Sequence, residues 1–285
     1  MIPRIFAQIV HHPLAYELGP LQLTGFGLAI LLSFVIGQII MQQELQRRGE
    51  NPEPAGDMIF AAVIGGLLGA KIYYAILTGD AGSLLNRAGF VFWGGLIGGI
   101  IAVSALVKAK RLGLARMSDV AGVALAGAYS VGRTGCWAVG DDYGSPYNGP
   151  LATVFPEGAP PSTAANMSGM FGVDFPAGTP PSQVISVHPT QIYEVGMGFV
   201  MFLILWRFRD HKHAQGWLFG FYCALAGVER FIVEFFRAKD DRLFGGALTI
   251  AQLIALLFAV GGVAIMAARW NVTPKAAGIY AKTRA

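Results

Sequence analysis

The sequence predicts an all-α integral membrane protein with seven transmembrane helices, and three observations support this. Of its 285 residues, 54% are hydrophobic and 13% are charged, whereas soluble domains carry about 25% charged residues. The mean hydropathy of +0.53 agrees, and together these values exclude a soluble globular enzyme, a disordered chain and a fibrous repeat. Seven stretches are apolar over the ~20 residues that a helix needs to cross a bilayer. They are continuously apolar rather than alternating, which argues against a β-barrel.

The predicted spans follow one another along the whole chain, which is therefore expected to be one transmembrane domain, residues 1–285. They cover residues 23–41, 58–77, 90–107, 117–139, 191–208, 216–236 and 248–268. The 38 glycines fit helices that pack closely through small residues. Residues 140–190 form the one long connection, which is rich in Gly and Pro, and we expect them to form an ordered extracytoplasmic cap.

The distribution of basic residues predicts the orientation, because short cytoplasmic loops are enriched in Lys and Arg. One side of the predicted topology holds Arg47, Arg48, Lys108, Lys110, Arg111, Arg116, Arg207, Arg209, Lys212, Arg269, Lys275, Lys282 and Arg284. The other side holds Arg4, Arg87, Lys239 and Arg242. The N-terminus is therefore expected outside and the C-terminus in the cytoplasm. The net charge of +4 is explained by this topology and requires no nucleic-acid partner.

An arginine lies inside the fourth predicted span, about two turns from its outer end. Arg133 belongs to the sequence Gly132-Arg133-Thr134-Gly135. Placing a charge inside a bilayer costs about 2.5–3.5 kcal/mol on insertion scales, so such residues are candidates for function. A guanidinium can hold a phosphate with two parallel hydrogen bonds. The alternative is a structural ion pair with Asp141, Asp142 or Glu194.

The fifth and sixth spans carry further candidates. Arg230, Glu234 and Arg237 are spaced i, i+4 and i+7, which predicts one helix face on which Glu234 bridges both arginines and leaves donors for an anion. The alternative is a cluster that merely caps the helix end. His188 precedes the fifth span, where Thr190 is expected to be the N-cap, and is a candidate catalytic or structural residue.

Together these motifs resemble the prolipoprotein diacylglyceryl transferase family, bacterial integral membrane enzymes that lipidate lipoprotein precursors. The similar segments occur in the family's order at residues 18–20, 65–73, 94–98, 132–135, 144, 154–156, 188–194, 230–237 and 248–252. The family also has seven spans with the N-terminus outside, as predicted above.

The resemblance implies transfer of a diacylglyceryl group from phosphatidylglycerol to the lipobox cysteine thiol of a prolipoprotein, which forms a thioether and releases glycerol phosphate. The implied partners are phosphatidylglycerol and prolipoprotein signal peptides in the bacterial inner membrane, with no cofactor and no metal. Arg133 and Arg230 match the family's essential arginines, and Glu234 and Arg237 match their supporting partners. Gly144 matches a family glycine of the substrate site.

This chain departs from the family pattern at several positions. Trp93 stands at the substrate site where many members have a histidine, and Cys136 and Asp141 replace an asparagine and a glutamate. Because Trp cannot accept a thiol proton, the base is Asp141 or His188, or the positive field alone favours the thiolate. The changes at Trp93 and Cys136, together with Phe26 where the family commonly has a tyrosine, also motivate an alternative, a non-catalytic lipid-binding member that serves as a subunit of a membrane complex. A transporter would predict inverted repeats, and the halves show no convincing one.

Overall fold

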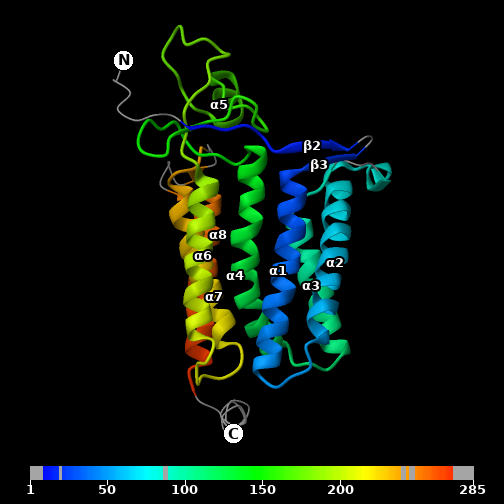
Figure 1. Cartoon of the computed structure of the whole chain (residues 1–285). Helices are drawn as coiled ribbons and strands as arrows, with labels where there is room; N and C mark the ends of the chain where they lie inside the picture. The colour runs from blue at the N-terminus through cyan, green and yellow to red at the C-terminus, as the bar shows by residue number, and fades with distance from the viewer. Residues whose placement is uncertain (1–8, 19–20, 86–88, 239–241, 244–247, 272–285) are drawn as a thin grey trace.

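The computed structural model describes residues 9–18, 21–85, 89–238, 242–243 and 248–271. Long helices run side by side in an elongated bundle (Figure 1). They are α1 (Gly25–Arg47), α2 (Glu53–Thr78), α3 (Phe92–Ala109), α4 (Leu114–Val139), α6 (Thr190–Phe208), α7 (Trp217–Glu234) and α8 (Ile250–Ala268). Each lies over one predicted stretch. The largest difference is at α1, which continues to Arg47 instead of ending at residue 41, because its last turns carry the buried side chains of Glu44 and Leu45.

Five of these helices are long and apolar enough to cross a membrane: α1, α2, α3, α6 and α8. This supports an all-α integral membrane protein. Helices α4 and α7 are not among the five, and both carry ionisable side chains within their length. Arg133 belongs to α4, and Glu229, Arg230 and Glu234 belong to α7.

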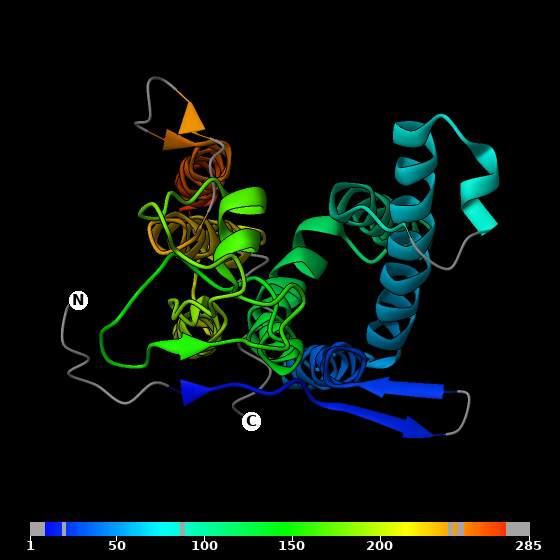
Figure 2. The same cartoon turned by 90° about the horizontal axis from the view of Figure 1, so that it is seen from above.

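The helices form two groups joined through α1 and α4. Seen from above, α2 and α3 lie together on one side and α6, α7 and α8 on the other (Figure 2). The α2–α3 pair is held by glycines: a Cβ atom added to Gly98 would lie 2.2 Å from the carbonyl oxygen of Gly65. The two backbones therefore touch, as in other membrane helix pairs with small residues at the contact.

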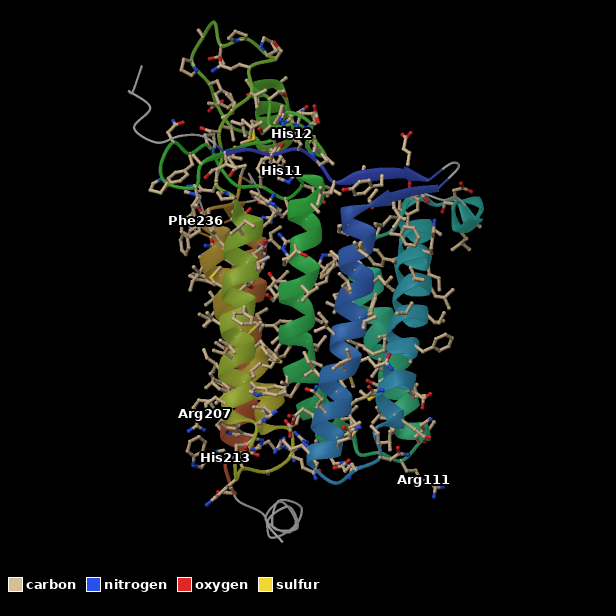
Figure 3. The ribbon with its side chains drawn as sticks, viewed as in Figure 1. His11, His12, Arg111, Arg207, His213 and Phe236 are labelled. Carbon is tan, nitrogen blue, oxygen red and sulfur yellow. The ribbon has the colours of Figure 1, made fainter. Side chains whose placement is uncertain are left out.

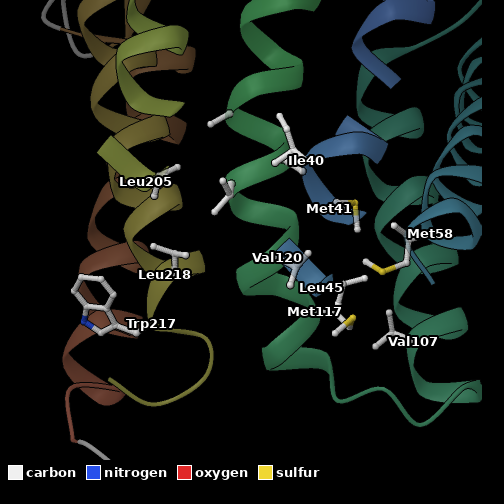
Figure 4. Packing of buried hydrophobic residues seen from close by; sticks show 14 of the residues in the cluster. Ile40, Met41, Leu45, Met58, Val107, Met117, Val120, Leu205, Trp217 and Leu218 are labelled. Carbon is white, nitrogen blue, oxygen red and sulfur yellow. The ribbon is translucent and has the colours of Figure 1, made fainter. Parts of the chain in front are cut away.

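The main apolar core lies at one end of the bundle. Figure 4 shows side chains from α1, α2, α3, α4, α6 and α7 in this region. Its largest fully buried members include Leu45, Met117, Leu205 and Leu218. This end is opposite to the one where α4 ends and α6 begins (Figure 1).

Short strands at the other end were not predicted from the sequence. β1 (Ile9–Val10) pairs in parallel with β4 (Thr153–Val154), and β2 (Ala15–Leu18) pairs antiparallel with β3 (Leu21–Thr24). β5 (Arg242–Leu243) pairs antiparallel with β6 (Leu248–Thr249), and a short 3₁₀ helix, η1, covers Ala81–Leu85. Strands of two to four residues are too short to leave a period-2 pattern in the sequence.

Residues 140–189 connect α4 to α6, and their role as an extracytoplasmic cap stays a prediction. This segment contains β4 and the helix α5 (Ala164–Phe171), and it lies over the ends of α4 and α6 (Figure 1). Its own apolar cluster includes Tyr143, Phe155 and Met167, with the rings of Tyr143 and Phe155 stacked 5.2 Å apart.

Part of the sequence interpretation falls outside the described residues. This applies to Gly19 and Pro20 of the first family segment and to residues used for the orientation, namely Arg4, Arg87, Lys239, Lys275, Lys282 and Arg284.

Candidate active site

The candidate site begins at the turn that ends α4. Gly140 ends the helix in the left-handed conformation with φ 70°, and Asp142 is also left-handed with φ 57°. Two side chains from the start of α6 hold this turn: Gln191 donates to the carbonyl of Asp141, and Thr190 Oγ1 donates to the carbonyl of Asp142 at 2.6 Å. The expectation that Thr190 is the N-cap is therefore wrong. Pro189 is the N-cap and makes no side-chain bond, because the Thr190 hydroxyl serves the turn.

Arg133 is held by carboxylates from two other elements. Its Nη2 pairs with Glu194 of α6, and its Nη1 lies 3.0 Å from Asp142 Oδ2 and 3.1 Å from Cys136 Sγ. The side chain of Arg133 is 14% exposed and that of Glu194 is 4% exposed. Two of the three acids considered from the sequence thus form the ion pairs.

Arg237 reaches the same carboxylate from the far side. Its Nη2 lies 2.7 Å from Asp142 Oδ1, and its side chain is 9% exposed. Glu234 instead pairs with Arg230 at 2.6 Å. The prediction that Glu234 bridges both arginines is not what the structure shows. Helix α7 ends at Glu234, so Arg237 lies beyond the helix and leaves its face.

Asp142 is therefore the junction of the site, because each of its two carboxylate oxygens meets a different arginine. Burial alone would raise the pKa of Asp142, but Arg237 and Arg133 outweigh it and hold that pKa well below the usual range. The carboxylate is ionised at neutral pH. Two arginines from separate elements thus converge on one anion.

Gly144 lies where the segment after α4 closely approaches the backbone after α7 and the residues before α6. A Cβ atom at this position would lie 2.2 Å from the carbonyl oxygen of Phe236 and 2.8 Å from the Cβ of His188. The Gly144 amide donates to the carbonyl of His188 at 2.8 Å, and Gly144 pairs with Arg237 in an isolated β-bridge. Phe236 lies at the same end of the bundle as His11 and His12 (Figure 3). Only glycine fits here, and the close approach brings Gly144 into a bridge with Arg237. The part of Gly144 in substrate binding stays a prediction.

Asp141 and His188, the two candidate bases, lie in different surroundings. The Asp141 carboxylate lies within 4.8 Å of both Cys136 Sγ and the carboxylate of Asp142. Burial and the Asp142 charge raise the pKa of Asp141. His188 stacks on Tyr147 with ring centres 3.8 Å apart, and burial lowers its pKa. Asp141 thus belongs to the arginine site, and His188 belongs to an aromatic cluster.

Trp93 lies at the start of α3, 44% exposed, with its ring 5.6 Å from that of Phe92. Helix α3 packs on α2, apart from α6 and α7 (Figure 2). Among the described side-chain contacts, none joins Trp93 to Arg133, so its part in a substrate site stays a prediction.

Two residues of the site went unassigned in the sequence. The Tyr129 hydroxyl on α4 lies 3.1 Å from Glu229 on α7 and 3.3 Å from Glu194 on α6. A phenol carries one proton, so both contacts are hydrogen bonds only if one carboxyl is protonated. An acid inside a predicted span was the signal that could have identified Glu229, since such groups need partners.

A family model and several known proteins that are similar to this chain all carry the same enzyme name. The family model for prolipoprotein diacylglyceryl transferase matches residues 13–268. The phosphatidylglycerol–prolipoprotein diacylglyceryl transferase of Clostridium tetani is 30% identical over 260 residues, covering 88% of this chain and 95% of the relative. The protein of the same name from Nitratidesulfovibrio vulgaris (strain Miyazaki F) is 32% identical over 265 residues, covering 87% and 91%. That of Geobacter sulfurreducens is 28% identical over 277 residues, covering 92% and 97%.

Proposed function

The chain belongs to the prolipoprotein diacylglyceryl transferase family, and from this premise we propose that it transfers a diacylglyceryl group from phosphatidylglycerol to the lipobox cysteine thiol of prolipoproteins. A thioether forms and glycerol phosphate leaves. The observation that carries the proposal is the meeting of Arg133 and Arg237 on one carboxylate, at 3.0 and 2.7 Å. Carboxylate and phosphate are both recognised by arginine forks, so the same pair suits a lipid phosphate.

The reaction needs positive charge at the leaving group and a base at the thiol. The thiol sulfur attacks the glyceryl carbon, the carbon–oxygen bond to phosphate breaks, and its electron pair stays on the phosphate. Arg133 and Arg237 stabilise that charge, and Arg230, paired with Glu234 at 2.6 Å and 30% exposed, is available to assist. Asp141 takes the thiol proton, because it is the candidate base that lies beside Cys136 and Asp142, which both contact Arg133.

The proposal also includes the membrane topology of the chain. All seven long helices cross the bilayer, with the N-terminus outside and the C-terminus in the cytoplasm of a bacterial inner membrane. Residues 140–189 then cap the outer end, where phosphatidylglycerol and the signal peptide of the prolipoprotein meet. The pairing of Arg133 on α4 with Glu194, and of Arg230 with Glu234 on α7, supports this, because paired charges lower the cost of placing these helices in lipid.

A complementation assay tests the transfer. We expect the chain to support growth of bacteria depleted of their own diacylglyceryl transferase, and a reporter lipoprotein to gain a thioether-linked diacylglyceryl group by mass spectrometry. Trp93→His, assayed beside the parent, reports whether the tryptophan limits transfer. The proposal would be contradicted if the reporter stayed unmodified although the chain was present in the membrane.

The assignment of the base makes a separate prediction about pH. Because a base must be ionised, kcat/KM should fall as pH drops through the raised pKa of Asp141. Asp142 cannot produce this acid limb, since its pKa lies well below the usual range. Asp141→Asn should lower kcat by about 10²–10⁴-fold, the usual contribution of a positioned base, and remove the acid limb.

The matched control is Asp174→Asn, an exposed aspartate in the same 140–189 segment, which should leave the profile unchanged. If His188→Gln lost the acid limb instead, while Asp141→Asn kept it, the base would be His188.

One observation favours the second candidate, a non-catalytic lipid-binding subunit of a membrane complex. The exposed Trp93 on α3 is a contact surface for another apolar chain as readily as for substrate. Stoichiometric co-purification with other membrane proteins, together with a blank transfer assay, would select this candidate.

A further inference from the structure

The position of Asp142 between two arginines has a consequence for substrate binding. Its oxygens lie 3.0 Å from Arg133 and 2.7 Å from Arg237, one to each guanidinium. A phosphate binding these arginines would place two of its oxygens where the carboxylate oxygens now lie, since both anions accept from arginine donors in the same way. The carboxylate and a phosphate cannot occupy this position together.

We propose that the Asp142 carboxylate is a built-in competitor of the lipid phosphate, which releases Arg133 and Arg237 only when a phosphoryl group displaces it. The proposal rests on the function proposed above and adds to it a residue that sets the affinity for the headgroup.

Of the two acids that pair with Arg133, Asp142 is the one whose side chain is exposed enough to leave. The side chain of Asp142 is 42% exposed, whereas that of Glu194 on the same arginine is 4% exposed. Its backbone carbonyl accepts from Thr190 Oγ1 at 2.6 Å and, more weakly, from Arg237 Nη1 at 3.4 Å, so Thr190 holds the turn without the carboxylate. Rotation about χ1 can therefore carry the carboxylate toward solvent while the Thr190 bond to the turn is kept.

Charge counting over the direct ion pairs supports displacement. Arg133 and Arg237 are balanced by Glu194 and Asp142, so the group has no net charge while Asp142 is in place. When the carboxylate leaves, one positive charge remains, which matches the single negative charge of a phosphodiester headgroup. While Asp142 is in place, these four side chains therefore offer no net positive charge to other anions.

Asp142→Asn tests this with little change of shape. Asparagine tolerates the left-handed backbone of this position as aspartate does, so the turn is expected to persist. A competent state populated at about one part in ten reduces apparent affinity about tenfold. We therefore expect Asp142→Asn to bind dihexanoyl-phosphatidylglycerol about tenfold more tightly in isothermal titration of the full-length protein, and to show a lower KM for phosphatidylglycerol.

A second variant, Asp142→Gly, also keeps the positive φ and removes the side chain altogether, so it should tighten binding as well. Glycerol phosphate, used as a second ligand, distinguishes the two sources of the phosphoryl group. Tighter binding of both ligands assigns the position to phosphate in general. Tighter binding of the lipid alone assigns it to the phosphodiester. Glu157→Gln is the matched control, because Glu157 is an exposed acid of the same segment that contacts His12. It removes one charge without touching the arginines and should leave both affinities unchanged.

Unchanged or weaker binding by both Asp142 variants would falsify the competitor role and make Asp142 a residue that only positions the arginines. This outcome is separable from failure of the proposed function. A parent that binds phosphatidylglycerol and lipidates a reporter, beside Asp142 variants that bind no better, overturns this inference alone. If neither the parent nor the variants bind the lipid, the proposed function fails as well.

Discussion

Arg133→Ala is expected to lower kcat/KM for diacylglyceryl transfer by at least about 10²–10³-fold, the loss typical of removing one preorganised donor to developing negative charge. The reason lies in the contacts of this side chain. It is 14% exposed, and its Nη1 lies 3.0 Å from the position that Asp142 occupies and that we assign to the phosphate. Incubation of the purified protein with phosphatidylglycerol and a lipobox peptide, followed by mass spectrometry of the peptide, measures the loss.

Loss of folding would also abolish transfer, so control variants must be assayed beside Arg133→Ala. Removing Arg133 leaves Glu194 buried without its counter-charge, and such single removals are strongly destabilising. Arg133→Met combined with Glu194→Gln removes both charges together and should restore stability without restoring transfer. Arg116→Ala is a matched control in the same helix, since Arg116 pairs with Glu50 at 3.5 Å near the opposite end. It should retain activity within about twofold. Full activity of Arg133→Ala would contradict the assignment.

The helices were predictable because long apolar stretches leave a strong signal, and each of the seven was found near its expected place. The pairing of Arg133 with Glu194 was also within reach, since a buried arginine needs an acid. The face shared by Arg230, Glu234 and Arg237 was not found, because apolar residues continue past Glu234 and conceal the end of the helix. Spacing predicts a shared face only as far as the helix extends.

The junction at Asp142 could not be predicted for a related reason. It depends on a left-handed turn after Gly140 and on the approach of Gly144 to Phe236, which is a contact between segments distant in the chain. Local sequence reports propensity and periodicity, whereas such contacts are set by tertiary packing. The two-residue strands were missed on the same grounds.

The second large effect is expected at the other end of the bundle, where Glu44→Gln should lower the stability of the protein. The Glu44 side chain is fully buried in α1 and pairs with Arg47 at 2.8 Å, Arg209 at 3.2 Å and Arg48 at 3.7 Å. Glutamine keeps the shape but leaves three arginines without this counter-charge. Breaking a buried pair on one side costs about 3–5 kcal/mol. Because Arg47 and Arg209 are each 22% exposed and partly screened by water, we expect about 3 kcal/mol.

This loss corresponds to a melting temperature lower by about 6–12 °C, measured at one scan rate in detergent. Asp210→Asn is the matched control from the same cluster. Asp210 also pairs with Arg47 but is 70% exposed, so its removal should cost under about 1 kcal/mol. Arg207 and His213 mark this end of the bundle in Figure 3, opposite to Phe236 and the candidate site. The affinity of folded Glu44→Gln for phosphatidylglycerol should therefore equal that of the parent. A melting temperature no lower than that of Asp210→Asn would show that the arginines find other partners, and that Glu44 does not fasten α1 to the connection after α6.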